Sequence, residues 1–203
     1  PISARMAPNT LLVAGGRVLT PAFDVVDADV LLDRDAGTIR AVGEDAADGD
    51  PDATLDASGG LVIPGLVNAH THVAMTLLRG YADDKPLDAW LQEDIWPAEA
   101  ELTAADVRAG AELGIVEMIR SGTTAFGDMY FHVPEIVEAV AAAGMRARLG
   151  HGVVTVGKDE AEAREDVAES VAVAREYDGA ADGRVRTAVM PHSLTTVDEA
   201  RLR

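Results

Sequence analysis

Residues 61–76, LVIPGLVNAHTHVAMT, contain the stretch that decides the fold. The segment 66–69 predicts a buried strand, because an apolar run here ends abruptly in the polar residues His70, Thr71 and His72. Side chains two positions apart on a strand share one face, so the imidazoles of His70 and His72 are expected side by side. Such a pair indicates either two metal ligands or two hydrogen-bonded histidines, and spacing alone does not separate these interpretations.

Downstream of Pro64, short apolar runs alternate with longer helical patterns. The predicted strands cover 66–69, 123–129, 146–154 and 185–190, and the predicted helices cover 87–95, 103–122, 134–144 and 159–177. A capping box formed by Thr196 and Glu199 predicts a further helix that reaches Arg203. Strands that alternate with helices indicate βαβ units and a parallel sheet, and therefore an α/β fold class.

Residues 64–203 would then form four βα units, which is half of a (β/α)8 barrel of the TIM type. A whole barrel needs about 250 residues, whereas the sequence has 203. We therefore expect these residues to be the N-terminal portion of a larger protein. A complete open sheet of four units is the competing interpretation.

Residues 1–63 follow a different pattern, in which short runs of Val, Ile and Leu are separated by turn residues. This pattern predicts a small antiparallel β unit with no catalytic role, whose strands cover 11–13, 17–19, 25–32, 38–42 and 54–55. The acidic segment 44–52 predicts an exposed loop.

Composition excludes several functions. The formal net charge of −18 disfavours nucleic acid and membrane surfaces as partners, because both are anionic. The sequence has no cysteine, so disulfides and thiolate ligands are excluded, and a metal would need His, Asp or Glu. No apolar run approaches the length of a spanning helix, and residues 1–9 lack the pattern of a signal peptide. We expect a cytoplasmic protein.

The stretch 61–76 resembles the first barrel strand of the amidohydrolase superfamily, in which His-x-His binds a catalytic divalent metal. Residues 77–103, LLRGYADDKPLDAWLQEDIWPAEAELT, and 121–131, SGTTAFGDMYF, resemble the branch of S-adenosylhomocysteine and methylthioadenosine deaminases, near the chlorohydrolase and guanine deaminase branches. The resemblance extends from about Leu11 to the end of the sequence. It implies that residues 1–63 are part of a small β-sandwich domain.

The resemblance assigns roles to individual residues. It makes His70 and His72 ligands of a divalent metal, most simply zinc, and Glu99 the carboxylate that accepts hydrogen bonds from ribose hydroxyls. Without the resemblance, Glu99 would be one more solvated acid. It also makes His192, at the end of the fourth strand, a substrate contact; the alternative is a structural histidine at a strand end. Asp128 could orient metal ligands, but we expect an ordinary loop residue.

Several positions depart from the pattern of the family or stay ambiguous. His151 stands where nucleoside deaminases commonly carry an arginine that contacts the homocysteine carboxylate, and we keep it as a candidate substrate-binding residue. Arg164 is a second candidate for that contact. A Pro-Tyr pair of the family is replaced by Leu194-Thr195. His132, like Asp128, could be a group that orients ligands, and we expect a loop residue.

The resemblance predicts a metal-dependent aminohydrolase that deaminates an adenosine-type nucleoside. Guanine deamination or triazine dechlorination is the alternative, and an inactive structural or interaction domain is a second one. Catalytic zinc generally has at least three protein ligands, so the resemblance implies that the remaining ligands and the catalytic acid follow Arg203. We expect a nucleoside as the small-molecule partner and a homo-oligomer as the assembly.

Overall fold

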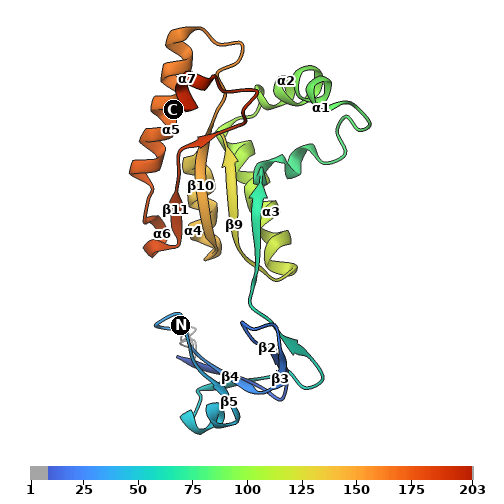
Figure 1. Cartoon of the computed structure of the whole chain (residues 1–203), viewed down its shortest axis with the longest axis vertical. Coiled ribbons are helices and arrows are strands. Elements are labelled where there is room, and N and C mark those ends of the chain that lie inside the picture. The colour runs from blue at the N-terminus through green and yellow to red at the C-terminus, as the bar shows by residue number, and fades with distance from the viewer. Residues whose placement is uncertain (1–8, 203) are drawn as a thin grey trace, which may run out of the picture. The chain divides into compact units, whose positions relative to one another are not determined.

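The computed structural model describes residues 9–202, and the chain divides into two compact units between Pro64 and Gly65. Figure 1 shows the first unit as a small β structure and the second as a sheet with helices. Among residues 9–202, no helix combines the length and hydropathy that crossing a lipid bilayer requires.

The first unit contains two small sheets, with strand orders β5-β4-β1-β6 and β3-β2-β7. The strands are β1 (Thr10–Ala14), β2 (Arg17–Leu19), β3 (Val25–Asp27), β4 (Asp29–Asp33), β5 (Thr38–Gly43), β6 (Ala53–Asp56) and β7 (Leu61–Val62). The prediction of a purely antiparallel unit is wrong, because β6 pairs with β1, and β7 with β2, in parallel. The single predicted strand 25–32 is divided at Ala28 into β3 and β4, which belong to different sheets.

The predicted loop 44–52 contains a 3-10 helix, η1 (Glu44–Gly49). The loop prediction is therefore wrong over this range. Ala46 of η1 is buried against Leu12 and Leu31, so one turn of the acidic segment covers the core of the first unit.

The second unit is built on a parallel sheet with the strand order β11-β10-β9-β8. Its strands are β8 (Leu66–Thr71), β9 (Thr123–Tyr130), β10 (Arg146–Val153), β11 (Val185–Thr187) and the short β12 (Met190–Pro191), which also pairs with β10. In Figure 1 the arrows of β9 and β10 point the same way. The predicted fourth strand, 185–190, is thus divided into β11 and β12.

Local signals explain where the long helices begin and end. In α3 (Ala104–Arg120), Thr103 and Asp106 form the capping box at the start, and Val107, Ala111 and Ile115 pack into the core. Gly144 ends α4 (Val133–Ala143) with a φ of 71°, a left-handed conformation that favours glycine. The helix α5 (Glu160–Glu176) begins with a second capping box, formed by Asp159 and Glu162. The short α6 (Ala180–Gly183) follows.

Between β8 and α3 the chain forms a series of short helices. These are η2 (Val73–Leu78), α1 (Leu87–Ala89), the π-helix η3 (Trp90–Ile95) and α2 (Trp96–Glu99). The predicted helix 87–95 therefore continues to Glu99 through a wide π turn. Figure 1 shows α1 and α2 beyond the arrowhead of β9.

The predicted capping box of Thr196 and Glu199 is wrong. The last helix, α7 (Glu199–Leu202), begins two residues later than that box requires, and the Asp198 carboxylate accepts a hydrogen bond from the Arg201 backbone N–H at 3.2 Å. The Thr196 hydroxyl instead lies 2.8 Å from Nδ1 of His192, so it contacts a candidate site residue.

Candidate functional site

A cavity of about 170 Å³ lies where the strands of the second unit end. It takes His72 from the end of β8, Tyr130 from the end of β9 and His192 from the segment after β12. The short helices between β8 and α3 contribute Glu99 and apolar side chains, namely Leu87, Trp90, Leu91, Ile95 and Trp96. The carboxyl ends of the parallel strands and the short helices thus place a few polar groups in a mostly apolar pocket. Such a pocket is typical of small-molecule sites.

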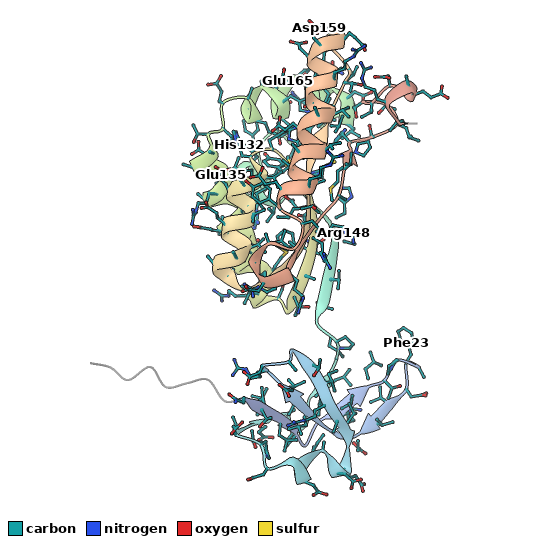
Figure 2. All side chains as sticks on the ribbon, turned by 90° about the vertical axis from the view of Figure 1, so that its left-hand side faces the viewer. Phe23, His132, Glu135, Arg148, Asp159 and Glu165 are labelled. Carbon is teal, nitrogen blue, oxygen red and sulfur yellow. The ribbon has the colours of Figure 1, made fainter. Side chains whose placement is uncertain are left out.

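The imidazoles of His70 and His72 lie side by side, with ring centroids 5.3 Å apart and nearly perpendicular planes. Nδ1 of His72 donates a hydrogen bond to the Met129 carbonyl oxygen at 2.8 Å. This bond fixes the tautomer, so Nε2 of His72 keeps its lone pair and can act as a metal ligand. Both histidines also line a neighbouring groove that His192 and Arg148 share; Figure 2 labels Arg148.

Asp128 holds the chain next to the two histidines. The expectation of a loop residue is wrong: Asp128 belongs to β9 and is 2% exposed. Its Oδ1 accepts hydrogen bonds from the Thr71 hydroxyl at 2.7 Å and from the Val73 N–H at 2.6 Å. Burial raises the pKa of Asp128 to about 6, against the opposing effect of these bonds. Its buried Oδ2 has no hydrogen-bond partner among residues 9–202.

The imidazoles of His70 and His72 are suitable ligands for a divalent metal, but two ligands are fewer than a catalytic metal site needs. Imidazole nitrogen is a preferred ligand of zinc, and Nε2 of His72 is free to bind it. In the part of the chain that the structure describes, three donors converge only at His151, Asp166 and Glu169, which lie elsewhere. The described residues therefore offer two imidazole ligands, and zinc in a catalytic site needs at least one more.

Glu99 ends α2 and is half-buried at the wall of the cavity. Burial raises the pKa of its carboxyl, while the nearby Tyr130 hydroxyl and His72 act in the opposite direction. Burial also raises the pKa of Tyr130, and the charge of Glu99 adds to this effect. The Tyr130 hydroxyl thus stays protonated next to a carboxylate, although it makes no hydrogen bond of regular geometry there.

His192 lies between the cavity and the groove of the two histidines and lines both. Burial lowers the pKa of His192, and the proximity of His72 and His70 lowers it further. Its backbone N–H donates to the Val153 carbonyl oxygen at 3.0 Å, which ties this residue to the end of β10.

A second cavity, of about 370 Å³, shares Glu99, Trp96, Tyr130, Phe131 and Val154 with the first. It is also lined by Ala100, Leu102, Val107, His132 and Lys158. His132, which Figure 2 labels, is exposed and precedes α4; of these two cavities it lines the second and not the first. Glu99 is the one carboxylate among the described residues that lines both cavities.

The structure does not bring His151 to either cavity. Residues 147, 149, 151 and 153 share the face of β10 that is turned toward the helices. The imidazole of His151 is therefore buried against α5, with Nε2 3.1 Å from Oδ1 of Asp166. His151 therefore lines neither cavity in the structure, and its contact with substrate stays a prediction. Arg164 lies on the exposed side of α5 and pairs with Glu160 at 2.8 Å, so it does not line these cavities either.

Several lining residues were missed from the sequence. Tyr130 could have been found from the alternation of β9, because it follows Phe126 and Asp128 on the same buried face. Trp90 and Lys158 carry no such signal: one depends on a π-helix and the other on the path of the loop between β10 and α5.

Comparisons with known proteins agree with this arrangement. Residues 61–203 match the model of the Amidohydrolase family. The chain is 69% identical over 195 residues to a 5-methylthioadenosine/S-adenosylhomocysteine deaminase of Halobacterium salinarum, covering 96% of the chain and 44% of that protein. It is 70% identical over 195 residues to the protein of the same name from Haloarcula marismortui, covering 96% and 45%.

Among solved structures, an adenosine deaminase from Xanthomonas campestris with bound zinc is similar at 34% identity, with a TM-score of 0.80 over 94% of this chain and 44% of that one. The chain thus spans just under half the length of the curated relatives that it matches. With a family match over residues 61–203, a parallel α/β sheet and a His-x-His pair at its edge, the chain belongs to the Amidohydrolase family.

Proposed function

We propose that the protein acts as a metal-dependent aminohydrolase that removes ammonia from an adenosine-type nucleoside. The observation that carries this proposal is the cavity in which His72, with its Nε2 free, and the Glu99 carboxylate both line one mostly apolar space. The identity of 69% to a deaminase of 5-methylthioadenosine and S-adenosylhomocysteine supports the substrate class. The parallel sheet would be the first half of a (β/α)8 barrel, and residues 1–63 part of a small β-sandwich domain.

His70 and His72 would hold the metal, which we take to be zinc from the imidazole donors and from the zinc in the Xanthomonas structure. A bound divalent ion lowers the pKa of a water ligand to about 7 and so supplies a nucleophile at neutral pH. The bond from His72 to Met129 holds the ring in the tautomer that such a ligand requires. Further ligands and the catalytic acid would come from outside residues 9–202.

The remaining residues would bind and orient the nucleoside. Glu99 can accept hydrogen bonds from both hydroxyls of a ribose, because a carboxylate offers two acceptor oxygens. The Tyr130 hydroxyl, held protonated beside this carboxylate and without another acceptor among residues 9–202, would donate to it or to the substrate. The apolar side chains of the short helices would exclude water from the base. His192 can offer its second ring nitrogen to the purine, since Nδ1 is engaged with Thr196.

Glu99 also discriminates between this function and its alternatives. Guanine and chlorotriazines carry no ribose, so the half-buried Glu99 carboxylate would have no pair of vicinal hydroxyls to bind and only N–H groups as donors. The half-buried position of Glu99 therefore favours a nucleoside over a free base.

The test is ammonia release by the product of the complete reading frame, assayed with zinc on 5′-methylthioadenosine, guanine and a chlorotriazine. We expect release from the nucleoside only. Glu99→Gln should raise KM for the nucleoside, while Glu101→Gln, a nearby exposed acid, should not. Turnover of guanine or the triazine without turnover of the nucleoside would overturn the proposal.

A further inference from the structure

The two cavities that share Glu99 impose an orientation on any bound nucleoside. In a ribose, the base at C1′ and the 5′ carbon at C4′ project from opposite ends of the edge that carries the 2′ and 3′ hydroxyls. Because Glu99 lines both cavities, a nucleoside held at these hydroxyls by Glu99, with its base toward His72 and His192, would direct its 5′ substituent into the second cavity. The lining of that cavity therefore selects the 5′ substituent.

The walls of the second cavity are largely apolar. Trp96, Leu102, Val107, Phe131 and Val154 provide them, and the Glu99 carboxylate also lines the cavity. Two basic side chains reach the cavity among the described residues, Lys158 and His132. His132 is exposed, where contact with an anion contributes little free energy. As far as residues 9–202 are concerned, recognition of an anionic substituent would therefore depend on Lys158.

Lys158 is already neutralised by a buried acid. Its Nζ lies 2.9 Å from Oδ1 of Asp166, whose side chain is 8% exposed. Asp166 also accepts hydrogen bonds from the Val154 N–H at 2.7 Å and interacts with Nε2 of His151 at 3.1 Å. Burial raises the pKa of Asp166, but these three partners outweigh burial and lower the pKa overall. Asp166 thus stays charged and holds Lys158.

The backbone keeps Lys158 in this place. The N–H groups of Thr155 and Val156 both donate to the Thr196 carbonyl oxygen, at 2.8 and 3.0 Å, and the Lys158 N–H donates to Thr155 at 3.2 Å. The next residue, Asp159, which Figure 2 labels, is the N-cap residue of α5. The backbone of Lys158 therefore lies on a fixed turn, from which its side chain reaches Asp166.

The other basic groups nearby are engaged as well. Arg164 pairs with Glu160, and Arg201 pairs with both Glu160 and Asp198. The imidazole of His151 faces Asp166 rather than the cavity. The second cavity thus combines apolar walls with a negative charge and a neutralised lysine.

We propose that the second cavity selects nucleosides whose 5′ substituent is neutral and apolar, such as a methylthio group, over those that end in a carboxylate, such as homocysteine. This inference rests on the proposed deamination of nucleosides and adds the substituent that the same site prefers. A carboxylate at this place would meet the Glu99 charge and a lysine that Asp166 already neutralises.

The test is a competition assay with the product of the complete reading frame, in which 5′-methylthioadenosine and S-adenosylhomocysteine compete for the enzyme. We expect kcat/KM to be at least about tenfold higher for 5′-methylthioadenosine, the range that separates a satisfied from an unsatisfied charged group. The methyl ester of S-adenosylhomocysteine is the matched probe, because it differs only at the carboxylate. We expect the ester to be deaminated at least as well as the acid.

A variant tests the role of Asp166 directly. Asp166→Asn keeps the size of the side chain but removes the charge that neutralises Lys158. We expect it to raise the kcat/KM of the acid relative to its ester by about tenfold. Glu165→Gln, an exposed neighbour on α5 labelled in Figure 2, is the control and should leave this ratio unchanged. If Asp166→Asn does not fold, the ratio of kcat/KM for the acid to kcat/KM for its ester in the unmodified enzyme tests the proposal.

The outcomes separate the two proposals. Deamination of both nucleosides with the acid preferred over its ester would overturn the selectivity and leave the proposed function intact. Failure to deaminate either nucleoside would overturn the proposed function, and the selectivity with it.

Discussion

Replacing Asp128 with asparagine is expected to stabilise the metal-free second unit at neutral pH. Asp128 is 2% exposed, and burial raises its pKa from an ordinary 3.8 to about 6. A difference of this size corresponds to about 3 kcal/mol, at 1.4 kcal/mol per pKa unit, that the folded state loses when the carboxyl ionises. Asparagine keeps an acceptor for Thr71 and Val73 but carries no charge.

The raised pKa of Asp128 determines how the stability difference between the two proteins changes with pH. The folded pKa lies above the unfolded one, so the stability that depends on a neutral Asp128 is fully present below about pH 4 and is lost as the pH rises through 6. The amide of asparagine places an unpaired N–H where Oδ2 lies, which costs about 1 kcal/mol. We therefore expect Asp128→Asn to be about 2 kcal/mol more stable at pH 7 and no more stable at pH 4.

The assay is urea unfolding with a chelator present, followed by tryptophan fluorescence. Both tryptophans of the sequence, Trp90 and Trp96, belong to the second unit, so the signal does not include unfolding of the first. Asp83→Asn, at an exposed acid of the same unit, controls for the change in net charge. A gain that is absent at pH 7, or equal at pH 7 and pH 4, would refute the reasoning.

Three further predictions concern packing, metal and salt. Gly65→Ala would place a Cβ 2.3 Å from Thr124 Cγ2 and 2.4 Å from its Oγ1, so we expect a loss of about 1–3 kcal/mol in unfolding free energy, with partial recovery on adding Thr124→Gly. Calorimetric titration with zinc should show binding that His70→Ala and His72→Ala each weaken by at least about tenfold; an affinity unchanged from that of the unmodified chain in both variants would exclude the His-x-His pair as the site. Because the net charge is −18, potassium chloride should raise the unfolding midpoint by screening repulsion, and sucrose at equal osmolality should reproduce less of this effect.

Elements with strong local signals could be predicted from the sequence. The capping residue Thr103 and the apolar period of α3 place that helix correctly, and Gly144 ends α4 as expected. The pairing of strands depends on distant contacts instead. Nothing local indicates that residues 25–32 divide at Ala28 between two sheets, or that Ala46 is buried under β1 and β4.

The candidate site, too, could be predicted from the sequence only in part. The proximity of His70 and His72 follows from strand geometry alone, and the structure places the two rings together. The orientation of His151 could also have been predicted from the sequence, because Ala147 and Leu149 mark the helix-facing side of β10. The role of Lys158 could not have been predicted from the sequence, because it depends on an ion pair with Asp166 across a loop.

The hydrogen bond from His72 to the Met129 carbonyl has an evolutionary consequence. Its acceptor belongs to the main chain, so no substitution of the side chain at position 129 removes it. A histidine oriented by a carboxylate side chain loses its support through one point mutation, whereas this ring is supported by the pairing of β8 with β9. Substrate preference can therefore change around His72 over many mutational steps while the orientation of the ring is inherited with the sheet.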